Sequence, residues 1–399
     1  MLLLILLCVL QGAVFASVVP AWRAPDEPSY FGEIRSFAID GRLYNLTGHP
    51  PLYPILGALP YLAAPTVNTK IFLIRLMGAL FNGVTVWFTY RAASEVFGEK
   101  RLAALLPPAI VAFNMQFNFI GASISSDSLL AMVSAIFFYL AMRSMVKSMD
   151  LKTGSALAAV AVLGILSKQR FFVLLPLYLP VLGVAAFRRI DLDKKRRELD
   201  ATRAIIWSFI GVIAAAIAGL VIYATAKTVP TAFPALSLLF SIKSVWSVLG
   251  TPSFLVKLFF EFWGYFDWLS LPLRNGTYVY FAGLVLLSAS GLLLAAIRRV
   301  RRLGLYGAFS DWRAVYWIVM FIGLALAVYA VVVYSIQTNG GAQGRYLFIV
   351  IAPIAIAIGR GLAELFGERH WRLAFGIVVV SLLAVDYLEL VYRVLPYYY

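Results

Sequence analysis

The sequence predicts an all-α, polytopic membrane protein, and three observations carry that prediction. First, 62% of the 399 residues are hydrophobic and only 13% are charged, whereas soluble domains are nearer half apolar and a quarter charged. Second, the mean hydropathy is +0.87. Third, apolar stretches of about 17–25 residues recur along the whole chain, and each can cross the hydrocarbon core of a bilayer. These properties exclude a soluble globular protein.

We expect about eleven membrane spans. They are 1–20, 70–91, 102–121, 127–146, 153–167, 170–187, 203–226, 278–297, 314–336, 345–365 and 371–392. The first lacks the basic start of a cleaved signal peptide, so we interpret it as an uncleaved span. Only the polar stretch 167–170 separates 153–167 from 170–187. These two are therefore expected to be short spans that meet at a shallow turn.

The net charge of +15 does not require a nucleic-acid partner, because the positive-inside rule accounts for it. If the N-terminus lies inside, the inner loops hold most of the 34 Lys and Arg residues, including the clusters 188–203 and 298–313. The prediction is N-terminus inside and C-terminus outside. Nucleic acid is not an expected partner, whereas membrane lipid is.

Two outer segments, 21–69 and 227–277, are too long to be simple turns. In the first, 31–39 mixes charged and apolar residues, a break follows at Asp40-Gly41, and 52–62 is apolar again. The second carries the aromatic run 262–268, which is also typical of an aromatic belt at the headgroup level. Both are expected to carry helices that lie on the membrane. Residues 1–399 form one expected domain without a soluble C-terminal domain.

Two adjacent carboxylates, Asp26 and Glu27, follow the first span and are flanked by Pro25 and Pro28. Charged groups at a membrane boundary are costly and mark functional sites where they face water or a cavity. The alternative is that an acid at this place only caps a short helix.

Further candidates fall on the same outer face: His49, Asp127, Lys168, Arg170, Trp263, Asp267, Gln343, Arg345 and Tyr346. Simpler structural explanations stay open for them. His49 precedes two prolines as turn residues do, Asp127 can cap its helix, and Lys168 and Arg170 can mark a re-entrant turn. Asp267 can accept a hydrogen bond from an indole or backbone N–H. Arg345 follows glycines that suit the close approach of a phosphate, although an Arg at a span end can also snorkel to the interface.

Together these groups suit glycosyl transfer from a lipid-phosphate sugar. A carboxylate can take a proton from an acceptor hydroxyl, Arg or Lys can hold a departing phosphate, and aromatic rings can stack on sugars or isoprenoids. The sequence has no phosphate-cradling glycine loop, no Cys/His metal cluster and no Ser-His-Asp elbow. Metal dependence stays open: Asp26 and Glu27 could share a Mg²⁺ or Mn²⁺ ion, with His49 as the other nearby ligand.

Several phrases resemble known membrane enzymes. Pro25-Asp26-Glu27-Pro28, followed by Gly41 and His49-Pro50-Pro51-Leu52, resembles the first outer loop of GT-C glycosyltransferases such as protein mannosyltransferases and the aminoarabinose transferases of lipid A. A closer resemblance is to the bacterial DUF2142 family. It rests on the same acidic pair, on Phe262-Trp263-Gly264, and on Gln343-Gly344-Arg345-Tyr346.

The resemblance implies a GT-C bundle in the bacterial cytoplasmic membrane, with the active site on the exterior (periplasmic) face. It implies inverting transfer from a polyprenyl-phosphate sugar to a lipid-linked or cell-envelope glycan. Asp26 would be the base with Glu27 as the adjacent alternative, and Arg345 would hold the donor phosphate, with Lys168 and Arg170 nearby. A flippase of lipid-linked sugars and a non-catalytic envelope-assembly subunit are the two alternatives. The near absence of charge inside the spans and of inverted repeats favours an enzyme over a transporter.

Overall fold

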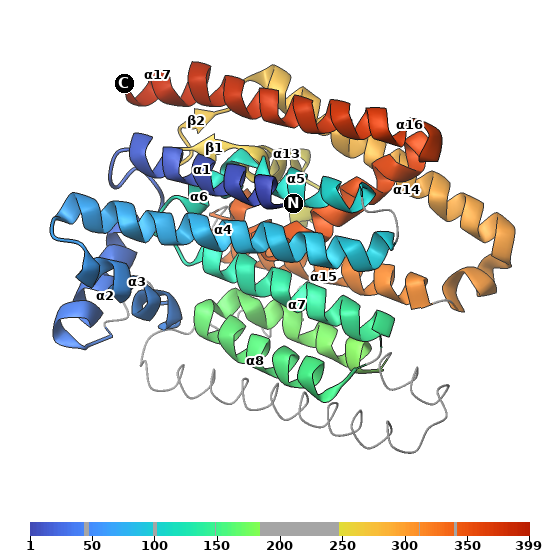
Figure 1. Cartoon of the computed structure of the whole chain (residues 1–399), viewed down its shortest axis with the longest axis horizontal. Helices are drawn as coiled ribbons and strands as arrows, with labels where there is room; N and C mark the ends of the chain where they lie inside the picture. Colours follow the sequence, from blue (N-terminus) through green and yellow to red (C-terminus); the bar gives the residue numbers. More distant parts are fainter. Residues whose placement is uncertain (44–47, 99–101, 148, 184–246, 311, 339–340) are drawn as a thin grey trace.

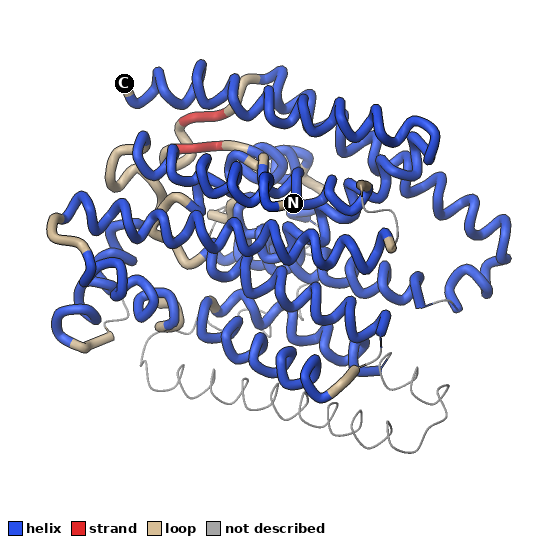
Figure 2. The backbone as a smooth tube through the Cα atoms, in the orientation of Figure 1, coloured by secondary structure: helices blue, strands red, loops and turns tan. Residues whose placement is uncertain are grey.

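The computed structural model describes residues 1–43, 48–98, 102–147, 149–183, 247–310, 312–338 and 341–399. Within these ranges nearly all of the backbone is helical (Figure 2). The longer helices are α1 (Leu2–Val18), α4 (Val67–Phe97), α7 (Asp127–Lys147), α8 (Leu151–Ser167), α14 (Asn275–Ser310), α15 (Trp312–Gln337) and α16 (Ile351–Glu389). They lie roughly side by side and form the bundle (Figure 1).

Shorter elements connect the long helices. The α-helical ones are α2 (Glu27–Asp40), α3 (Leu52–Ala63), α5 (Leu106–Ala112), α6 (Met115–Gly121), α13 (Pro252–Trp263) and α17 (Leu395–Tyr398). The 3₁₀ segments are η1 (Ala103–Leu105), η2 (Gln169–Leu177) and η4 (Gly344–Val350), and η5 (Leu390–Val394) is a π-helical turn. Strands β1 (Tyr265–Phe266) and β2 (Leu271–Pro272) form an antiparallel pair in which Tyr265 lies opposite Pro272.

The prediction of a multi-pass helical fold is confirmed, but the count of spans is not. Among the described residues six helices are long and apolar enough to cross a membrane, or seven if the bent pair α5–α6 is one span. Three expected spans correspond to shorter apolar helices, namely α1, α8 and Gln169–Gly183. The expected span 203–226 lies outside the described residues.

The last two expected spans, 345–365 and 371–392, match Gly344–Gly367 and Arg369–Tyr398. They meet inside α16 at Gly367, whose φ of 63° is left-handed. Glycine adopts this conformation without the steric penalty of a Cβ. The chain therefore reverses here, and its last helix runs back to the opposite end of the bundle (Figure 1).

Helices α2 and α3 fall within the expected outer segment 21–69. They pack against each other at one end of the bundle, on the left of Figure 1. Helix α2 ends at Gly41, which has a φ of 63° and donates its N–H to Phe37 O at 3.1 Å, as a left-handed C-terminal cap does. In segment 227–277, α13 and the β1–β2 hairpin are described, and residues 227–246 lie outside the described ranges.

Small residues allow a close contact between α14 and α16. A Cβ added to Gly291 would lie 1.8 Å from the carbonyl oxygen of Gly361, and one added to Gly361 would lie 2.0 Å from that of Ser288. Packing of this kind lets helices associate in a bilayer, where burial of apolar surface gives no drive. Two glycines and a serine thus allow α14 and α16 to pack closely against each other.

Candidate active site

The two acids at the start of α2 have different surroundings. Asp26 has a φ of 68°, and its side chain makes no capping hydrogen bond to α2. About half of this side chain (51%) is exposed. Glu27 is completely buried. Pro28 at the start of α2 suits the first helical turn, where no backbone donor is needed. The left-handed turn at Asp26 therefore directs two consecutive carboxylates into different environments.

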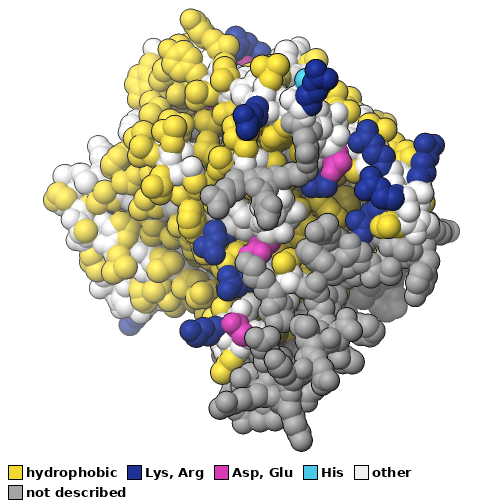
Figure 3. Space-filling model, turned by 45° about the vertical axis from the view of Figure 1, so that its right-hand side comes forward, with side chains coloured by type: hydrophobic (Ala, Val, Ile, Leu, Met, Phe, Trp, Pro, Cys, Tyr) yellow, Lys and Arg dark blue, Asp and Glu magenta, His cyan; other side chains and the backbone are white. Residues whose placement is uncertain are grey.

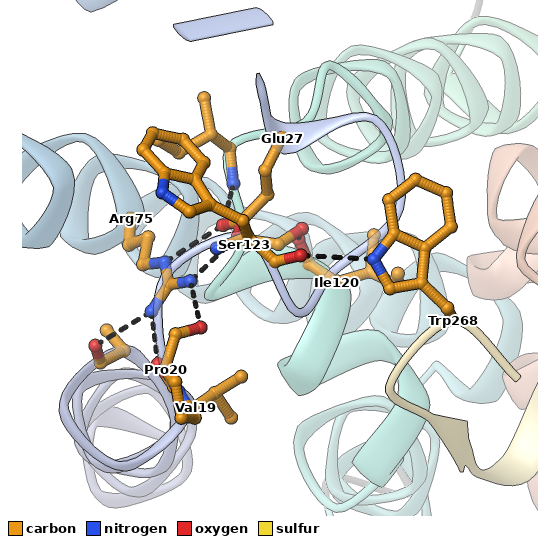
Figure 4. Close-up of polar contacts among 10 residues, drawn as sticks. Val19, Pro20, Glu27, Arg75, Ile120, Ser123 and Trp268 are labelled. Carbon is orange, nitrogen blue, oxygen red and sulfur yellow. Dashed lines mark hydrogen bonds and ion pairs between the residues drawn. The ribbon is translucent and has the colours of Figure 1, made fainter. Parts of the chain in front are cut away.

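Glu27 forms a buried, bidentate ion pair with Arg75 of α4 (Figure 4). Arg75 Nε donates to Oε1 at 2.9 Å and Nη2 donates to Oε2 at 2.8 Å. Backbone N–H groups of Ile124 and Trp22 also donate to the carboxylate, each at 3.0 Å. Each carboxylate oxygen of Glu27 therefore accepts two hydrogen bonds.

The remaining donors of Arg75 bind the end of α1 and the loop after it. Nη1 donates to the carbonyl oxygens of Ala16 (3.2 Å) and Val19 (2.6 Å), and Nη2 donates to that of Pro20 (3.1 Å). With the two bonds to Glu27, all five guanidinium N–H groups are used. We call Glu27 and Arg75 the closed pair. It joins α1, α2 and α4 and holds Asp26 at the edge of the site.

A second charged cluster draws on four distant parts of the chain. Arg345 Nη2 donates to Asp26 Oδ2 at 2.8 Å, and Arg345 Nη1 lies 3.7 Å from Asp127 Oδ2. Lys168 Nζ donates to Asp127 Oδ1 at 2.5 Å, and Arg170 Nη1 lies 3.9 Å from the same oxygen. We call these five residues the open cluster. Three cations face two carboxylates, so one positive charge is in excess.

The open cluster has donors that none of the described residues uses. Arg345 Nε and Nη1 and Arg170 Nη1 are buried and make no hydrogen bond within the described part of the chain, and neither does Asp127 Oδ2. A buried N–H without a partner costs about 1–3 kcal/mol. Such donors around an excess positive charge are suited to an anion with several oxygens, which phosphate supplies.

Aromatic rings support the cations of this cluster. The guanidinium carbon of Arg170 lies 3.2 Å from the ring centroid of Tyr346 and 5.3 Å from that of Tyr334. The two tyrosine rings meet edge to face at 5.3 Å. Cation–π contact holds the guanidinium plane without using its N–H donors. Tyr346 therefore positions Arg170 and leaves Nη1 available.

The sequence motifs 262–264 and 343–346 pack directly against each other. Gly344 N donates to Glu261 Oε2 at 2.8 Å, and a Cβ on Gly344 would lie 2.4 Å from the backbone nitrogen of Phe262. Only glycine therefore allows η4 to contact α13 at this point. Burial raises the pKa of the Glu261 carboxyl. Gly344 thus fixes the start of η4 and, one residue later, the position of Arg345.

His49 lies beside the open cluster and is half-buried. Its ring stacks on Tyr30 at a centroid distance of 5.9 Å, and the Tyr30 hydroxyl lies 2.6 Å from Ser126 Oγ. Burial and then the nearby charges of Lys168 and Arg170 lower the pKa of His49 well below its usual value. The imidazole is therefore neutral at physiological pH.

Three predicted site residues make none of the contacts described above. Trp263 is buried and stacks on Phe281 with a centroid distance of 4.0 Å, so it contributes to packing. Asp267 lies in the β1–β2 turn, where its Oδ2 accepts from the Tyr397 hydroxyl at 2.6 Å. Gln343 is half-buried just before η4. Thus the structure brings Asp26, Asp127, Lys168, Arg170, Arg345, Tyr346 and His49 together, with Glu27 behind them.

The residues do not fit a shared divalent cation. Both oxygens of Glu27 are engaged by the closed pair, and Asp26 faces Arg345. Within the described ranges no group of three or more His, Cys, Asp and Glu side chains could hold a metal ion. The excess positive charge of the open cluster suits an anion instead.

Arg75 is the residue that sequence reasoning missed. It lies in the expected span 70–91, and an ionisable residue inside a span is by itself a signal of function or of a buried partner. The partner, Glu27, lies 48 residues earlier in the chain. Helix periodicity does not reveal a pairing over that separation.

Comparison with known proteins supports the fold. Residues 48–206 match the family described as dolichyl-phosphate-mannose-protein mannosyltransferase. The matched segment contains His49, Asp127, Lys168 and Arg170 but neither Asp26 nor Arg345. Comparison with curated proteins gives no match.

Solved structures of membrane transferases are similar in fold. The archaeal oligosaccharyltransferase AglB from Archaeoglobus fulgidus, in complex with an inhibitory peptide and a dolichol-phosphate, aligns with a TM-score of 0.55 at 12% identity, over 100% of this chain and 55% of that chain. The apo form of the same protein aligns with a TM-score of 0.54 at 13% identity, over 100% of this chain and 55% of that chain. ArnT from Cupriavidus metallidurans bound to undecaprenyl phosphate aligns with a TM-score of 0.49 at 17% identity, over 95% of this chain and 63% of that chain.

The chain therefore has a GT-C fold and spans little more than half the length of the oligosaccharyltransferase. At these identities the likeness concerns the fold, and at a TM-score of 0.49 the ArnT alignment adds no weight. The narrower resemblance to DUF2142 stays a prediction.

Proposed function

We propose that this protein is a membrane glycosyltransferase that moves a sugar from a polyprenyl-phosphate donor to a glycan or lipid-linked acceptor. The observation that carries the proposal is the open cluster, in which unused buried N–H donors of Arg345 and Arg170 lie beside the half-exposed carboxylate of Asp26. The match to a dolichyl-phosphate-mannose family supports a lipid-phosphate donor. So does the dolichol-phosphate in a structure of similar fold.

The proposed chemistry uses the two sides of the cluster for two tasks. Asp26 accepts the proton of an acceptor hydroxyl, whose oxygen forms a bond to the anomeric carbon of the donor sugar. The bond between that carbon and the phosphate oxygen breaks, and its electron pair stays on the phosphate. Arg345 and Arg170 then stabilise the phosphate charge through N–H groups that are already in place. Attack opposite to the leaving phosphate inverts the anomeric configuration.

Donor binding also frees the base. Arg345 Nη2 donates to Asp26 Oδ2 without a ligand, and a carboxylate engaged with a guanidinium is not available to a hydroxyl. A phosphate that takes over Arg345 releases Asp26 for proton transfer. Glu27 cannot exchange partners in this way, because the closed pair uses both of its oxygens. We therefore assign Asp26 as base and Glu27 as a positioning residue.

Lys168 and His49 complete the proposed site. Lys168 neutralises Asp127, which keeps that carboxylate from repelling a phosphate. Neutral His49 offers a hydrogen-bonding edge for a sugar hydroxyl without adding charge. We place the site at the exterior end of the bundle, in accord with the predicted topology of a bacterial cytoplasmic-membrane protein.

The test is release of polyprenyl phosphate from polyprenyl-phosphate sugars by the purified full chain. Asp26→Asn should lower transfer by about 10²–10⁴-fold, the usual contribution of a general base, without changing the unfolding temperature. Asp40→Asn is the matched control, because Asp40 is an exposed acid on the same helix. Wild-type transfer by Asp26→Asn would refute the assigned base. Movement of the intact lipid-linked sugar across the membrane, with no phosphate released, would favour a flippase, and neither activity would favour an assembly subunit.

A further inference from the structure

A cavity of about 550 Å³ opens at the other end of the bundle from the candidate active site. Helix α4 relates the two places: Arg75 lies near its first end, and Phe97, its last residue, lines the cavity. At about 1.5 Å per residue the two are about 33 Å apart along the helix. That is close to the thickness of the hydrocarbon core. The cavity therefore lies at the opposite membrane boundary.

The cavity is lined by more arginine than acid. Arg298 comes from α14, and Arg360, Glu364 and Arg372 come from the two halves of α16. Arg360 forms an ion pair with Glu364. In the described part of the chain, neither Arg298 nor Arg372 forms an ion pair. Two uncompensated guanidinium groups from different helices therefore face one cavity.

An indole supplies a further donor. Trp371 lines the cavity with only 8% of its surface exposed. Its buried Nε1 has no hydrogen-bond acceptor among the residues that the structure describes. A buried indole N–H usually has a partner. The combination of two free arginines and this N–H suits an oxyanion.

Lipid can reach the cavity from the side. In both Asn275–Gly304 and Arg369–Tyr398, only 22% of the most apolar window is buried inside the protein. Leu293 of α14 and Leu373 and Ile377 of α16 are largely exposed apolar residues near the cavity-lining arginines in sequence. Figure 3, which turns the right-hand end of Figure 1 forward, shows Lys and Arg side chains next to extensive apolar surface. Charge and apolar surface adjoin, as a lipid headgroup and its acyl chains require.

We propose that this cavity binds the phosphodiester headgroup of an anionic membrane lipid. Arg298 and Arg372 bind the phosphate oxygens, the Trp371 N–H donates to the same headgroup, and the acyl chains lie along α14 and the second half of α16. Basic pockets between membrane helices bind anionic headgroups by this chemistry. The site is separate from the open cluster and does not depend on the transfer reaction.

Native mass spectrometry of the full chain in detergent tests the proposal, with phosphatidylglycerol, phosphatidylcholine and inorganic phosphate as probes. The wild type should bind phosphatidylglycerol about tenfold or more tightly than phosphatidylcholine. The double variant Arg298→Gln/Arg372→Gln should lose about tenfold or more of its phosphatidylglycerol affinity, because two cations near a membrane surface contribute this much. Arg301→Gln/Arg302→Gln is the matched control. It removes the same charge from exposed positions of α14 outside the cavity, and should change affinity by less than about twofold.

Three results would overturn the proposal. An unchanged affinity in the cavity variant would do so. An equal loss in the control would indicate general surface charge instead of a site. Displacement of phosphatidylglycerol by millimolar inorganic phosphate would indicate a free-anion site. If the double variant fails to fold, as judged by its unfolding temperature, Arg372→Gln alone serves, because Arg372 is exposed. It should lose about threefold or more, and no loss would refute the proposal.

Discussion

The closed pair and the open cluster are both built from buried arginine and carboxylate, yet they differ in how their hydrogen bonds are used. Every N–H of Arg75 has an acceptor inside the protein. Arg345 is nearly as buried, with 4% of its side chain exposed, but its Nε and Nη1 have none among the described residues. The closed pair is a finished structural joint. We propose that an anion completes the open cluster.

In the sequence Asp26 and Glu27 form one acidic pair, and their roles cannot be told apart. The difference in hydrogen bonding assigns a structural role to Glu27 and leaves Asp26 as the candidate for function. A buried charge pair with all partners present stabilises only as a whole, and loss of one member leaves an uncompensated charge. A buried cation with unused donors costs stability and is retained for function. Substitution of Arg75 should therefore lower the stability much more than substitution of Arg345.

The largest expected effect is on folding, through the closed pair. Arg75→Met leaves the Glu27 carboxylate buried without its cation and should lower the free energy of unfolding by about 3–5 kcal/mol. Thermal and denaturant unfolding in detergent measure this. The double variant Glu27→Gln/Arg75→Met removes the stranded charge and should recover part of the loss. If Arg75→Met unfolds like the wild type, the closed pair is not a structural joint.

A smaller effect is expected from Arg345→Gln, in the open cluster. Asp127 keeps Lys168, and Asp26 is half exposed, so neither carboxylate is stranded. Two unpartnered buried N–H groups disappear as well. The free energy of unfolding should change by no more than about 1 kcal/mol, in the same assay as for Arg75→Met. A loss as large as that of Arg75→Met would mean that the cluster is structural and would remove the contrast between the two regions.

A third effect concerns pH and sharpens the boundary of the open cluster. The pKa of His49 is held well below its usual value by burial and by Lys168 and Arg170, against the opposing charge of Asp127. The unfolded chain therefore binds a proton below about pH 6.5 that the folded chain does not. Stability is fully present above that pH and falls as the pH drops, by up to about 1.4 kcal/mol per pH unit.

Unfolding temperatures between pH 7.5 and 5.5 test this, where His49→Gln should flatten the decline below about pH 6.5. The matched control is His370→Gln, which removes the other, exposed histidine of the chain and should leave the decline unchanged. The reverse pattern would place His49 outside the charged surroundings of the cluster.

Much of the fold could be predicted from the sequence because a membrane helix is a local run of apolar residues. Hydropathy gave the spans that match α4, α7, α14 and α15, and the Asp40-Gly41 break matches the left-handed end of α2. Short apolar helices such as α8 were harder, because hydropathy alone does not tell a span from a buried or shallow helix. Bends inside apolar stretches, as between α5 and α6, leave no periodic signal either.

The candidate site was also predictable only in part. Asp26 and Arg345 were expected on one face, and the structure joins them although 319 residues separate them. The functions of neighbours were not predictable, because they depend on which side of a turn or helix faces the core. Glu27 turns inward to Arg75, and Trp263 turns to Phe281. A one-residue change in phase on a helix moves a side chain by about 100°, and only tertiary packing decides that phase.

The most direct test of the central claim is whether a phosphate completes the open cluster. Unfolding temperatures of the wild type and of Arg345→Gln should be measured with polyprenyl phosphate and with the uncharged polyprenol of the same chain length. We predict that the phosphate stabilises the wild type and the alcohol does not, since a ligand that binds only the folded state raises its stability, and that Arg345→Gln loses most of this stabilisation. Equal stabilisation by phosphate and alcohol, or an unchanged phosphate effect in Arg345→Gln, would contradict the account.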